Sequence, residues 1–548
     1  MKPHLPRSPS HSGSPFLALA LALALAPTLA LAPTARAVAI DPIPAGLPAG
    51  ERFAMDSGLT VVLVPNPANP WLEIQLGFRA GGGADPAGKE GLASLLGRML
   101  TTGTPELSEQ ALAEELSRLG AFIGPDVGMD SFVLGGHVPT FSDADTRRFL
   151  GIFFDVALSP ALPADVLERE KTLRKGLIDR IADNPEALAE IAAKLAAYGD
   201  GPFGRSTLGT AASIARVTRD DLVAMRNALF NPRHGVLVIG GAFDPAPMRA
   251  WLERRLDRCA DDATGPAAGA CRFGAGLEAT AGGLPGRFSR LCAKPSIPCG
   301  KDGGNVACTG DVAPICFDNP LAYAPPQSAG LPSARTIHVV IDDSGLTQIP
   351  FRLVAPNPIP MVDTRWPAFR LATFVLGGDF TSRLNLRLRT QEGLTYGAYF
   401  QPAFGGHASG AMSVSTDATP DALPKAVSLT KAEIERLWTE PIPAAELMRS
   451  RQMMVNGFAF KFETLGNTIE QYLTLELAGV PLSWLADWRA ALARPTAEEI
   501  RASLSVVAPA HMALVVVGPV SIADAVARIG HGPVTMVSAR DLLTSGLP

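Results

Sequence analysis

Two segments of the chain repeat the same order of hydrophobic and polar positions. Residues 60–64 (Thr-Val-Val-Leu-Val) and residues 337–341 (Ile-His-Val-Val-Ile) are short apolar runs of the kind that form buried strands. Each run is followed by a second apolar segment, residues 72–78 in the first copy and 349–355 in the second. Residues 72–78 alternate as a half-buried strand does. The pattern predicts the same arrangement of strands twice.

The two copies also end alike. Thr218–Asp221 and Thr496–Glu499 have the residues of helix starts, and in the second a threonine and a glutamate form a capping box that satisfies free backbone N–H groups. A short connection and a buried strand then close each copy, within residues 231–240 and 508–518. Because several landmarks match in one order, a true repeat is favoured over a coincidence of common patterns. The predicted fold class is α+β, with two homologous α/β-sandwich halves.

Composition agrees with a folded, multidomain protein. The chain has 548 residues, which is too long for a single hydrophobic core, and it is 47% hydrophobic and 18% charged. The formal net charge is −5, and no basic block is present. These values argue against nucleic acid as a partner.

The N-terminus has the pattern of a secretory signal. Lys2 and Arg7 precede an apolar run from Phe16 to Ala32, and residues 35–37 (Ala-Arg-Ala) offer a cleavage site. We therefore expect residues 1–37 to be a signal peptide, and the protein to be periplasmic or otherwise exported. The alternative is an uncleaved membrane anchor, for which the apolar run is at the short limit. No later segment is long and apolar enough to span a membrane, so no other membrane contact is expected.

All six cysteines lie in one glycine- and proline-rich segment. An even number of cysteines in an exported protein predicts a small insert held by disulfides. A metal site is the weaker alternative, because the segment has no Cys-x-x-Cys pair and no histidine lies among the cysteines. The sequence does not choose among the possible pairings. The candidates for disulfide formation are Cys259, Cys271, Cys292, Cys299, Cys308 and Cys316.

Residues 91–104 (Gly-Leu-Ala-Ser-Leu-Leu-Gly-Arg-Met-Leu-Thr-Thr-Gly-Thr) resemble the zinc helix of the pitrilysin/insulinase metallopeptidases. In that family the segment reads Gly-Leu-Ala-His-x-x-Glu-His-Met, followed by an apolar pair and Gly-Thr. Ser94 and Arg98 occupy the positions of the two histidine ligands, and Gly97 that of the general base. A catalytic zinc needs imidazole or anionic ligands, usually three from the protein. The resemblance therefore implies a degenerate zinc motif.

The third zinc ligand of the family is a glutamate in a later helix rich in Glu-Arg pairs. The matching helix is predicted over residues 166–178, and the ligand register falls near Arg174 or Lys175, so that a cation replaces the anion. The remaining histidines form no pair at metal-ligand spacing. We expect no metal in this chain. The histidines outside the motif that form no such pair are His137, His234, His338, His407, His511 and His531.

Residues 376–397 of the second copy resemble the C-domain signature of the same family. That signature is a Gly-Gly loop, Ser-Arg-Leu, a helix and then Arg-x-x-x-Gly-x-x-Tyr, which here ends in Arg389, Gly393 and Tyr396. The resemblance implies that Arg389 and Tyr396 reach across a cavity to the opposite half's zinc site. Tyrosine would donate to the oxyanion, and arginine, with its fixed fork of donors, would hold a substrate carbonyl. From spacing alone, the two residues read as a surface charge and a half-buried ring.

The resemblance covers most of the chain after the signal and implies two halves that face each other like a clamshell. We expect an N-terminal peptidase-like domain (38–258), a cysteine-rich linker or insert (259–335) and a C-terminal peptidase-like domain (336–548). The insert departs from the family, whose linker is usually short.

In the processing-peptidase branch of the family, two chains share one site, and one of them carries the Arg/Tyr pair with a decayed zinc motif. The sequence has this second pattern. It predicts an exported, non-catalytic subunit of a heterodimeric zinc peptidase, active only with a zinc-bearing partner that holds the metal, and acting on a peptide substrate. The alternative is a stand-alone pseudopeptidase that binds peptides or serves as a scaffold in the cell envelope.

Overall fold

The structure is a computed structural model. It describes residues 50–256, 333–342, 345–357, 359–402, 411–504 and 508–547, together with the backbone of four short strands between residues 290 and 318. The predicted signal peptide lies outside the described residues, as does most of the cysteine-rich segment. In the part of the chain that is described, no helix has both the length and the apolar character needed to cross a membrane.

The first half is built on a six-stranded mixed sheet with the order β1-β2-β6-β3-β5-β4. β2 and β6 are parallel, and the other neighbours are antiparallel. The two apolar runs predicted as strands are β2 and β3, and the closing strand is β6, so these three predictions are confirmed. The strands are β1 (Glu51–Ala54), β2 (Thr60–Pro65), β3 (Trp71–Phe78), β4 (Phe122–Val127), β5 (Phe132–Pro139) and β6 (Gly235–Gly241).

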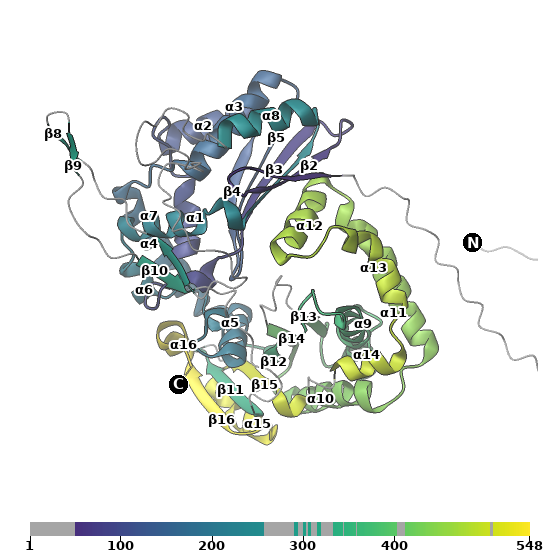
Figure 1. The fold of residues 1–548 in the computed structure, drawn as a ribbon. Helices are drawn as coiled ribbons and strands as arrows, with labels where there is room; N and C mark the ends of the chain where they lie inside the picture. The colour runs from purple at the N-terminus through teal and green to yellow at the C-terminus, as the bar shows by residue number, and fades with distance from the viewer. Residues whose placement is uncertain are drawn as a thin grey trace, which may run out of the picture. The chain divides into compact units, whose positions relative to one another are not determined.

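Helices α2, α3 and α8 cover one face of this sheet (Figure 1). Their apolar side chains and those of α1 and α7 form one core with the inward side chains of β2, β3 and β5. The helices of this half are α1 (Leu92–Leu100), α2 (Glu109–Leu119), α3 (Asp143–Leu158), α4 (Ala164–Ile181), α5 (Pro185–Tyr198), α6 (Ala211–Ala215), α7 (Arg219–Leu229) and α8 (Pro245–Leu256).

The second half has a six-stranded mixed sheet with the same strand order. In the order β16-β11-β15-β12-β14-β13, strands β11, β15, β12 and β14 stand where β2, β6, β3 and β5 stand in the first sheet. The edge strands differ, since β16 is parallel to β11 whereas β1 is antiparallel to β2. The predicted repeat is therefore present in the fold. The strands are β11 (Arg335–Val340), β12 (Ile349–Pro356), β13 (Tyr399–Pro402), β14 (Ala411–Ala418), β15 (Ala513–Gly518) and β16 (Val534–Ser538).

Both predicted helix starts are observed. The Thr218 side chain accepts from the N–H of Asp221 at the start of α7. At the start of α14, the N–H of Glu499 donates to Thr496 Oγ1 (3.1 Å) and the N–H of Thr496 donates to Glu499 Oε2 (2.7 Å), which completes the capping box. The helices of the second half are α9 (Trp366–Gly377), α10 (Leu423–Thr439), α11 (Ala444–Gly457), α12 (Leu465–Ala478), α13 (Ser483–Ala493), α14 (Ala497–Leu504), α15 (Ala523–Arg528) and α16 (Ala539–Ser545), with a π-helix, η6 (Asn385–Gln391).

The remaining described elements are short strands and 3-10 helices. Backbone strands in the cysteine-rich segment are β7 (Arg290–Ala293), β8 (Gly300–Asp302), β9 (Asn305–Ala307) and β10 (Ile315–Asp318). Short 3-10 helices lie at Gly82–Ala84, Pro202–Gly204, Pro232–His234, Phe458–Phe462, Pro509–His511 and Val520–Ile522. β7 and β10 pair antiparallel, with Cys292 opposite Cys316 in the register. The cysteine side chains lie outside the described residues, so the disulfides stay a prediction.

Each half lends one helix to the other half's sheet. α12 packs on β3 and β6 of the first half, and α5 packs on β12 and β15 of the second. Close approach of α12 depends on glycine, because a Cβ at Gly77 would lie 2.8 Å from Leu473 Cδ1 and one at Gly240 would lie 2.7 Å from Leu465 Cδ1. Neither exchange is visible in the periodicity of a single segment.

Ion pairs accompany both helix exchanges. Arg52 of β1 donates to the two carboxylate oxygens of Glu476 in α12, at 2.7 and 3.1 Å. Arg79 donates to the backbone carbonyl of the same residue, at 2.6 Å. On the other sheet, Arg352 of β12 pairs with Glu186 of α5 at 2.5 Å. The halves are thus joined by buried apolar contacts and by charged ones.

Candidate functional site

The degenerate motif forms helix α1. Ser94 is half-buried and Arg98, one turn later, has a side chain that is 46% exposed. Gly97 is buried, and a Cβ there would lie 3.0 Å from both Pro125 Cβ and Val127 Cγ2 of β4. β4 therefore packs closely against the position where the family carries its general base, and a glutamate side chain there would require Pro125 and Val127 to shift.

A buried carboxylate holds the start of α1. Asp85 accepts the N–H groups of Gly91 (2.7 Å) and Ala93 (2.8 Å), so it satisfies two of the free donors at the helix N-terminus. Burial raises the pKa of Asp85 to about 8, against the opposing effect of these two donors. Gly91 takes a left-handed conformation (φ +90°) that favours glycine. Together these features fix where the motif residues lie.

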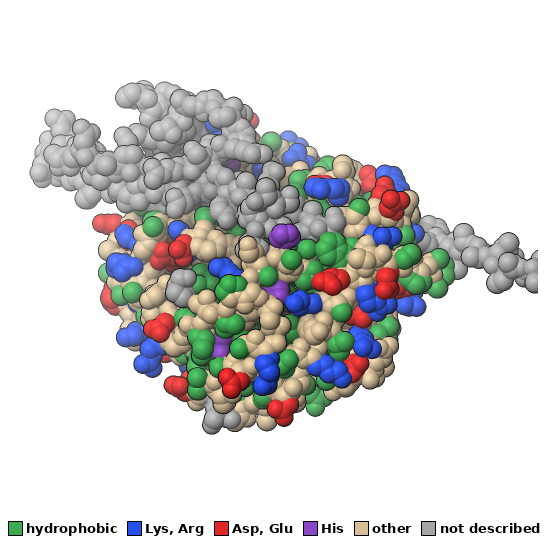
Figure 2. All heavy atoms as spheres, turned by 90° about the horizontal axis from the view of Figure 1, so that it is seen from below, with side chains coloured by type: hydrophobic (Ala, Val, Ile, Leu, Met, Phe, Trp, Pro, Cys, Tyr) green, Lys and Arg blue, Asp and Glu red, His purple; other side chains and the backbone are tan. Residues whose placement is uncertain are grey.

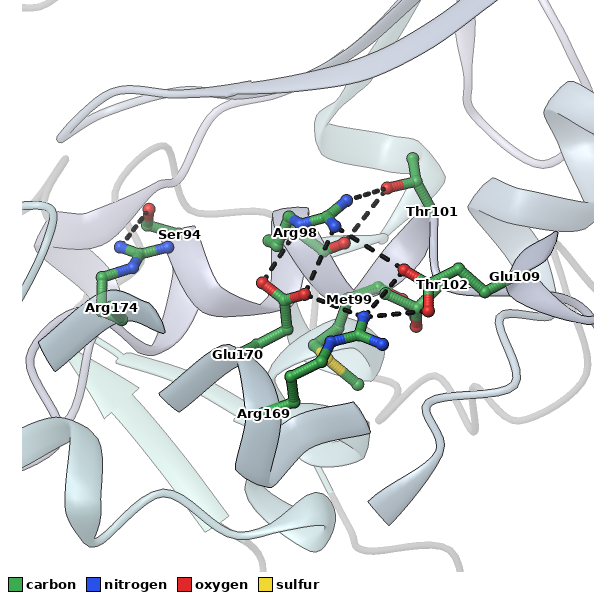
Figure 3. A network of polar contacts seen from close by, with 9 residues as sticks. All are labelled: Ser94, Arg98, Met99, Thr101, Thr102, Glu109, Arg169, Glu170 and Arg174. Atoms are coloured by element: carbon green, nitrogen blue, oxygen red, sulfur yellow. Dashed lines mark hydrogen bonds and ion pairs between the residues drawn. The ribbon is translucent and has the colours of Figure 1, made fainter. Parts of the chain in front are cut away.

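Helix α4 presents an arginine to the first ligand position. Arg174 Nη1 donates a hydrogen bond of 2.9 Å to Ser94 Oγ (Figure 3). Of the two residues that the sequence placed in the third-ligand register, Arg174 therefore faces the motif, whereas Lys175 is exposed. Burial lowers the pKa of Arg174, partly offset by the fields of Glu170 and Asp85.

A second arginine occupies the other ligand position and is neutralised. Arg98 Nε lies 3.2 Å from Glu170 Oε2, and its Nη2 lies 3.3 Å from Oε1. Glu170 is buried and also accepts from Arg169 at 3.1 Å, while Glu109 lies 2.8 Å from Arg169 and 3.7 Å from Arg98. Figure 3 shows these four side chains as one network, with Arg174 and Ser94 beside it.

The residues at this position do not fit zinc. A hydroxyl and two guanidinium groups stand where two imidazoles and a carboxylate would be needed, and guanidinium carries a permanent positive charge. Within the described ranges, no group of three His, Cys, Asp or Glu residues could hold a metal ion. We therefore derive no zinc chemistry from this chain's own N-terminal half.

The second-half signature forms an exposed aromatic and cationic surface. Arg389 lies on η6, with its guanidinium carbon 4.9 Å from the ring centroid of Phe380, which is itself 59% exposed. Tyr396 follows η6 and is 82% exposed. The Phe380 ring also meets Tyr399 edge to face, at 6.4 Å between centroids. We call these four residues the Arg/Tyr surface. Exposed aromatic rings and an arginine are typical of binding surfaces.

A buried asparagine holds the loop that carries Tyr396. Asn385 is fully buried in η6, donates to the carbonyls of Asp379 and Ala398 (both 2.9 Å), and accepts the N–H of Ala398 (3.0 Å). Thr416 Oγ1 donates to the Gly397 carbonyl (2.9 Å) from β14. Neither Asn385 nor Thr416 was predicted from the sequence as part of the site. The signal for Asn385 was a polar residue at an apolar position of a helix, which requires internal partners.

Ser382 and Arg383, the Ser-Arg pair of the signature, make internal contacts. Ser382 Oγ donates to the Asp379 carbonyl (2.6 Å), and Arg383 pairs with both oxygens of Glu446 in α11, at 2.8 and 2.9 Å. η6 is a π-helix, an element often found at functional sites. These contacts hold the residues directly before η6, so Arg389 extends from an element that is anchored at its start.

The charge on the displayed face is mixed (Figure 2). On the face that Figure 2 displays, basic and acidic side chains alternate, and neither sign forms an extended area. This distribution offers no continuous basic track of the kind that binds a nucleic-acid backbone.

The fold and the degenerate motif define a class of protein, and comparison with known families identifies it. The model described as "Insulinase (Peptidase family M16)" matches residues 60–211, and the one described as "Peptidase M16 inactive domain" matches residues 216–454. The chain belongs to the M16 peptidase (insulinase) family. The resemblance that the sequence motifs indicated is thus confirmed.

Several proteins are similar to this chain, over shares of its length that differ widely. The "Non-peptidase homolog YmxG" of Helicobacter pylori is 22% identical over 77% of this chain and 83% of its own length. The "Probable mitochondrial-processing peptidase subunit beta" of Schizosaccharomyces pombe is 27% identical over 32% of this chain and 38% of its own length. The crystal structure of a peptidase M16 inactive domain from Pseudomonas fluorescens has a TM-score of 0.67 and 20% identity, over 86% of this chain and 98% of that one. A protease from H. pylori gives a TM-score of 0.68 and 16% identity, over 86% of this chain and all of that one.

Proposed function

We propose that this chain is a non-catalytic M16 subunit that binds a peptide and supplies Arg389 and Tyr396 to the zinc centre of a partner chain. The observation that carries the proposal is the contact between Arg174 and Ser94. Two of the three positions that hold zinc ligands in the family are occupied by Arg174, whose positive charge repels a metal ion, and by Ser94, whose neutral hydroxyl does not replace an imidazole ligand. The chain thus lacks the centre that generates the nucleophile but retains the exposed Arg/Tyr surface.

The roles proposed for Arg389 and Tyr396 follow from the chemistry of their side chains. A zinc ion in the partner would activate the attacking water. Tyr396 would donate its hydroxyl to the oxyanion that forms on the scissile carbonyl, a contact that strengthens as charge develops. Arg389 would donate to a backbone carbonyl of the bound peptide, which exists before the reaction begins. Asn385 would act as a positioning residue, because it holds the backbone beside Tyr396.

The comparisons support a heterodimer. One relative is named as the beta subunit of a mitochondrial-processing peptidase, which indicates that members of the family work as subunits. The partner of this chain would be a family member with an intact zinc motif. The predicted signal segment adds the proposal that the pair is exported, with the periplasm or another exported location as the site of action.

A second candidate function is a stand-alone pseudopeptidase that binds peptides or acts as an envelope scaffold. The observation in its favour is the H. pylori relative named as a non-peptidase homolog, which matches far more of this chain than the processing-peptidase subunit does. In this case the Arg/Tyr surface would bind peptide without serving any zinc centre.

Reconstitution with the zinc-bearing chain distinguishes the two functions. The mixed pair should cleave peptides that neither chain cleaves alone. Tyr396→Phe should assemble normally and lose about 10²–10³-fold in turnover with little change in substrate affinity. Arg389→Ala should also weaken substrate binding, since its contact exists in the ground state.

Arg387→Ala is the matched control. Arg387 lies on the same π-helix and pairs with Glu392 (3.1 Å), so its removal takes away a charge near the site without touching the Arg/Tyr surface. It should leave turnover unchanged. If Tyr396→Phe and Arg389→Ala are as active as the unmodified pair, the assignment is wrong and the scaffold function stands.

A further inference from the structure

Arg174 has donor capacity that the protein does not use. A guanidinium group has five N–H donors, and the hydrogen bond to Ser94 engages one of its nitrogens. Throughout the described ranges, no carboxylate lies within ion-pair distance of Arg174. The charge is also partly removed from water, since burial is the main influence on the Arg174 pKa and lowers it. A half-buried guanidinium that makes no direct ion pair with the described residues favours an external anion.

The neighbouring carboxylates are engaged elsewhere. Glu170 receives donors from Arg98 and Arg169, and Glu109 receives them from Arg169. Asp85 caps the start of α1, where its two carboxylate oxygens accept the N–H groups of Gly91 and Ala93. Arg98 and Arg169 therefore pair with Glu109 and Glu170, and among the described residues Arg174 has no carboxylate of its own at ion-pair distance.

Ser94 extends the donor set. Its Oγ accepts from Arg174, so its own hydroxyl hydrogen is available to donate. The guanidinium fork matches a planar carboxylate, to which it donates two parallel hydrogen bonds. A carboxylate beside α4 would thus receive donors from both residues that have replaced zinc ligands.

The surroundings favour a carboxylate that belongs to a peptide. Leu173 precedes Arg174 and is 59% exposed, and Leu177 lies about one turn further on and is 38% exposed. These two exposed apolar side chains stand on α4 directly before Arg174 and three residues after it. A peptide with an apolar residue near a carboxylate would contact both.

We propose that the lost zinc position has become a carboxylate site, in which Arg174 and Ser94 bind the C-terminal carboxylate or an acidic side chain of a peptide. This inference rests on the proposed peptide-binding function and deepens it. In a zinc peptidase the corresponding position meets the scissile bond in the middle of a substrate. A carboxylate site there would select a chain end or an acidic residue instead.

Peptide titration calorimetry on the whole chain tests the proposal. The probes are an acetylated alternating Ala/Leu peptide as the free acid, the same peptide as its C-terminal amide, and the amide with one internal Glu. The free acid, the Glu peptide or both should bind about tenfold more tightly than the plain amide, a difference of about 1.4 kcal/mol. Which of the two gains affinity identifies the source of the carboxylate.

Variants locate the effect. Arg174→Gln should abolish the preference, Ser94→Ala should reduce it, and Arg174→Lys should retain part of it because the charge remains. Lys175→Gln is the matched control, since it removes one positive charge from the next residue of the same helix and should leave the preference intact. Ser94→Ala keeps the test valid if Arg174→Gln does not fold.

A second measurement separates this inference from the peptide-binding function. Acetate should raise the melting temperature of the unmodified chain relative to chloride at equal ionic strength, and should not do so in Arg174→Gln. If no peptide binds but acetate still protects, the carboxylate site stands and the proposed function fails. If peptides bind without preference, or if acetate and Arg174→Gln have no effect, the carboxylate site is overturned and peptide binding is judged separately.

Discussion

Arg98 and Glu170 form a two-point ion pair between α1 and α4, with Arg98 Nε 3.2 Å from Glu170 Oε2 and Nη2 3.3 Å from Oε1. Arg98 stands at a zinc-ligand position of the family, so a contact between two side chains has taken over part of the work of a metal in holding these helices together. The buried carboxylate of Glu170 is well paired, because it receives guanidinium donors from both Arg98 and Arg169.

Glu170→Gln should therefore destabilise the first half. The carboxylate is buried, and its removal takes the charged acceptor from Arg98 and one of two carboxylate partners from Arg169, which we expect to cost about 1–2 kcal/mol. The measurement is the free energy of unfolding in urea, compared between Glu170→Gln and a control variant. The control is Glu168→Gln on the same helix, where the glutamate is exposed and pairs with Lys171; it should change stability much less. Equal effects of the two variants would contradict the structural role of the pair.

Restoration of the zinc motif should fail with three substitutions and improve with a fourth. Ser94→His, Gly97→Glu and Arg98→His together supply two ligands and a base, but Arg174 still points at the first ligand position. Addition of Arg174→Glu should provide the missing anion and allow zinc uptake after dialysis. Both multiple variants should be less stable, because a side chain at Gly97 meets Pro125 and Val127. Stoichiometric zinc in the unmodified chain would contradict the assignment of the site.

Mild acid should destabilise the second half through two buried histidines. His338 Nε2 donates to the Gly518 carbonyl (3.2 Å) and His531 Nε2 donates to the Met512 carbonyl (2.8 Å), and burial lowers the pKa of both below the usual 6.5. Below about pH 6.5 the unfolded chain gains protons that the folded chain does not, so the free energy of unfolding falls as pH falls.

The measurement is the slope of unfolding free energy against pH between about 7 and 5, in urea titrations. His338→Gln and His531→Gln should each make this slope shallower, and the double variant should show the largest effect. An unchanged slope in the double variant would show that other groups cause the acid sensitivity.

Asn385→Ala should loosen the loop that carries Tyr396. The substitution leaves the buried N–H and carbonyl of Ala398 without their partner, which we expect to cost about 1–3 kcal/mol. Amide exchange of residues 393–398 should accelerate more than that of α10. With a zinc-bearing partner, turnover should fall while substrate affinity changes little. If exchange rises uniformly across the second half, Asn385 is a stabilising residue and not a positioning one.

Protein isolated from the cell envelope should begin near Val38 and contain disulfides. The sequence supplies the cleavage site and six clustered cysteines, and the register of β7 and β10 sets Cys292 opposite Cys316. N-terminal sequencing and non-reducing peptide mapping test both points. An intact Met1 terminus, or six free thiols without reductant, would contradict them.

The sequence by itself determined the repeated strand order, the helix starts at Thr218 and Thr496, and the loss of ligands at Ser94 and Arg98. These features are readable because strand alternation, capping and metal ligation depend on residue types at short, fixed spacings. Motif spacing also narrowed the third-ligand register to Arg174 or Lys175. A choice between adjacent residues depends on how a helix is rotated about its axis, and spacing along the chain does not record this.

Only the tertiary structure decided what replaced the zinc site. Arg174 meets Ser94 and Arg98 meets Glu170 because α4 packs beside α1 in one rotation, a contact between residues far apart in the chain. The exchange of α5 and α12 between the halves was equally hidden, since an apolar helix face does not specify which sheet will cover it. Local patterns thus gave the elements and the missing ligands, and long-range packing determined the contacts that turned a metal site into a charged one.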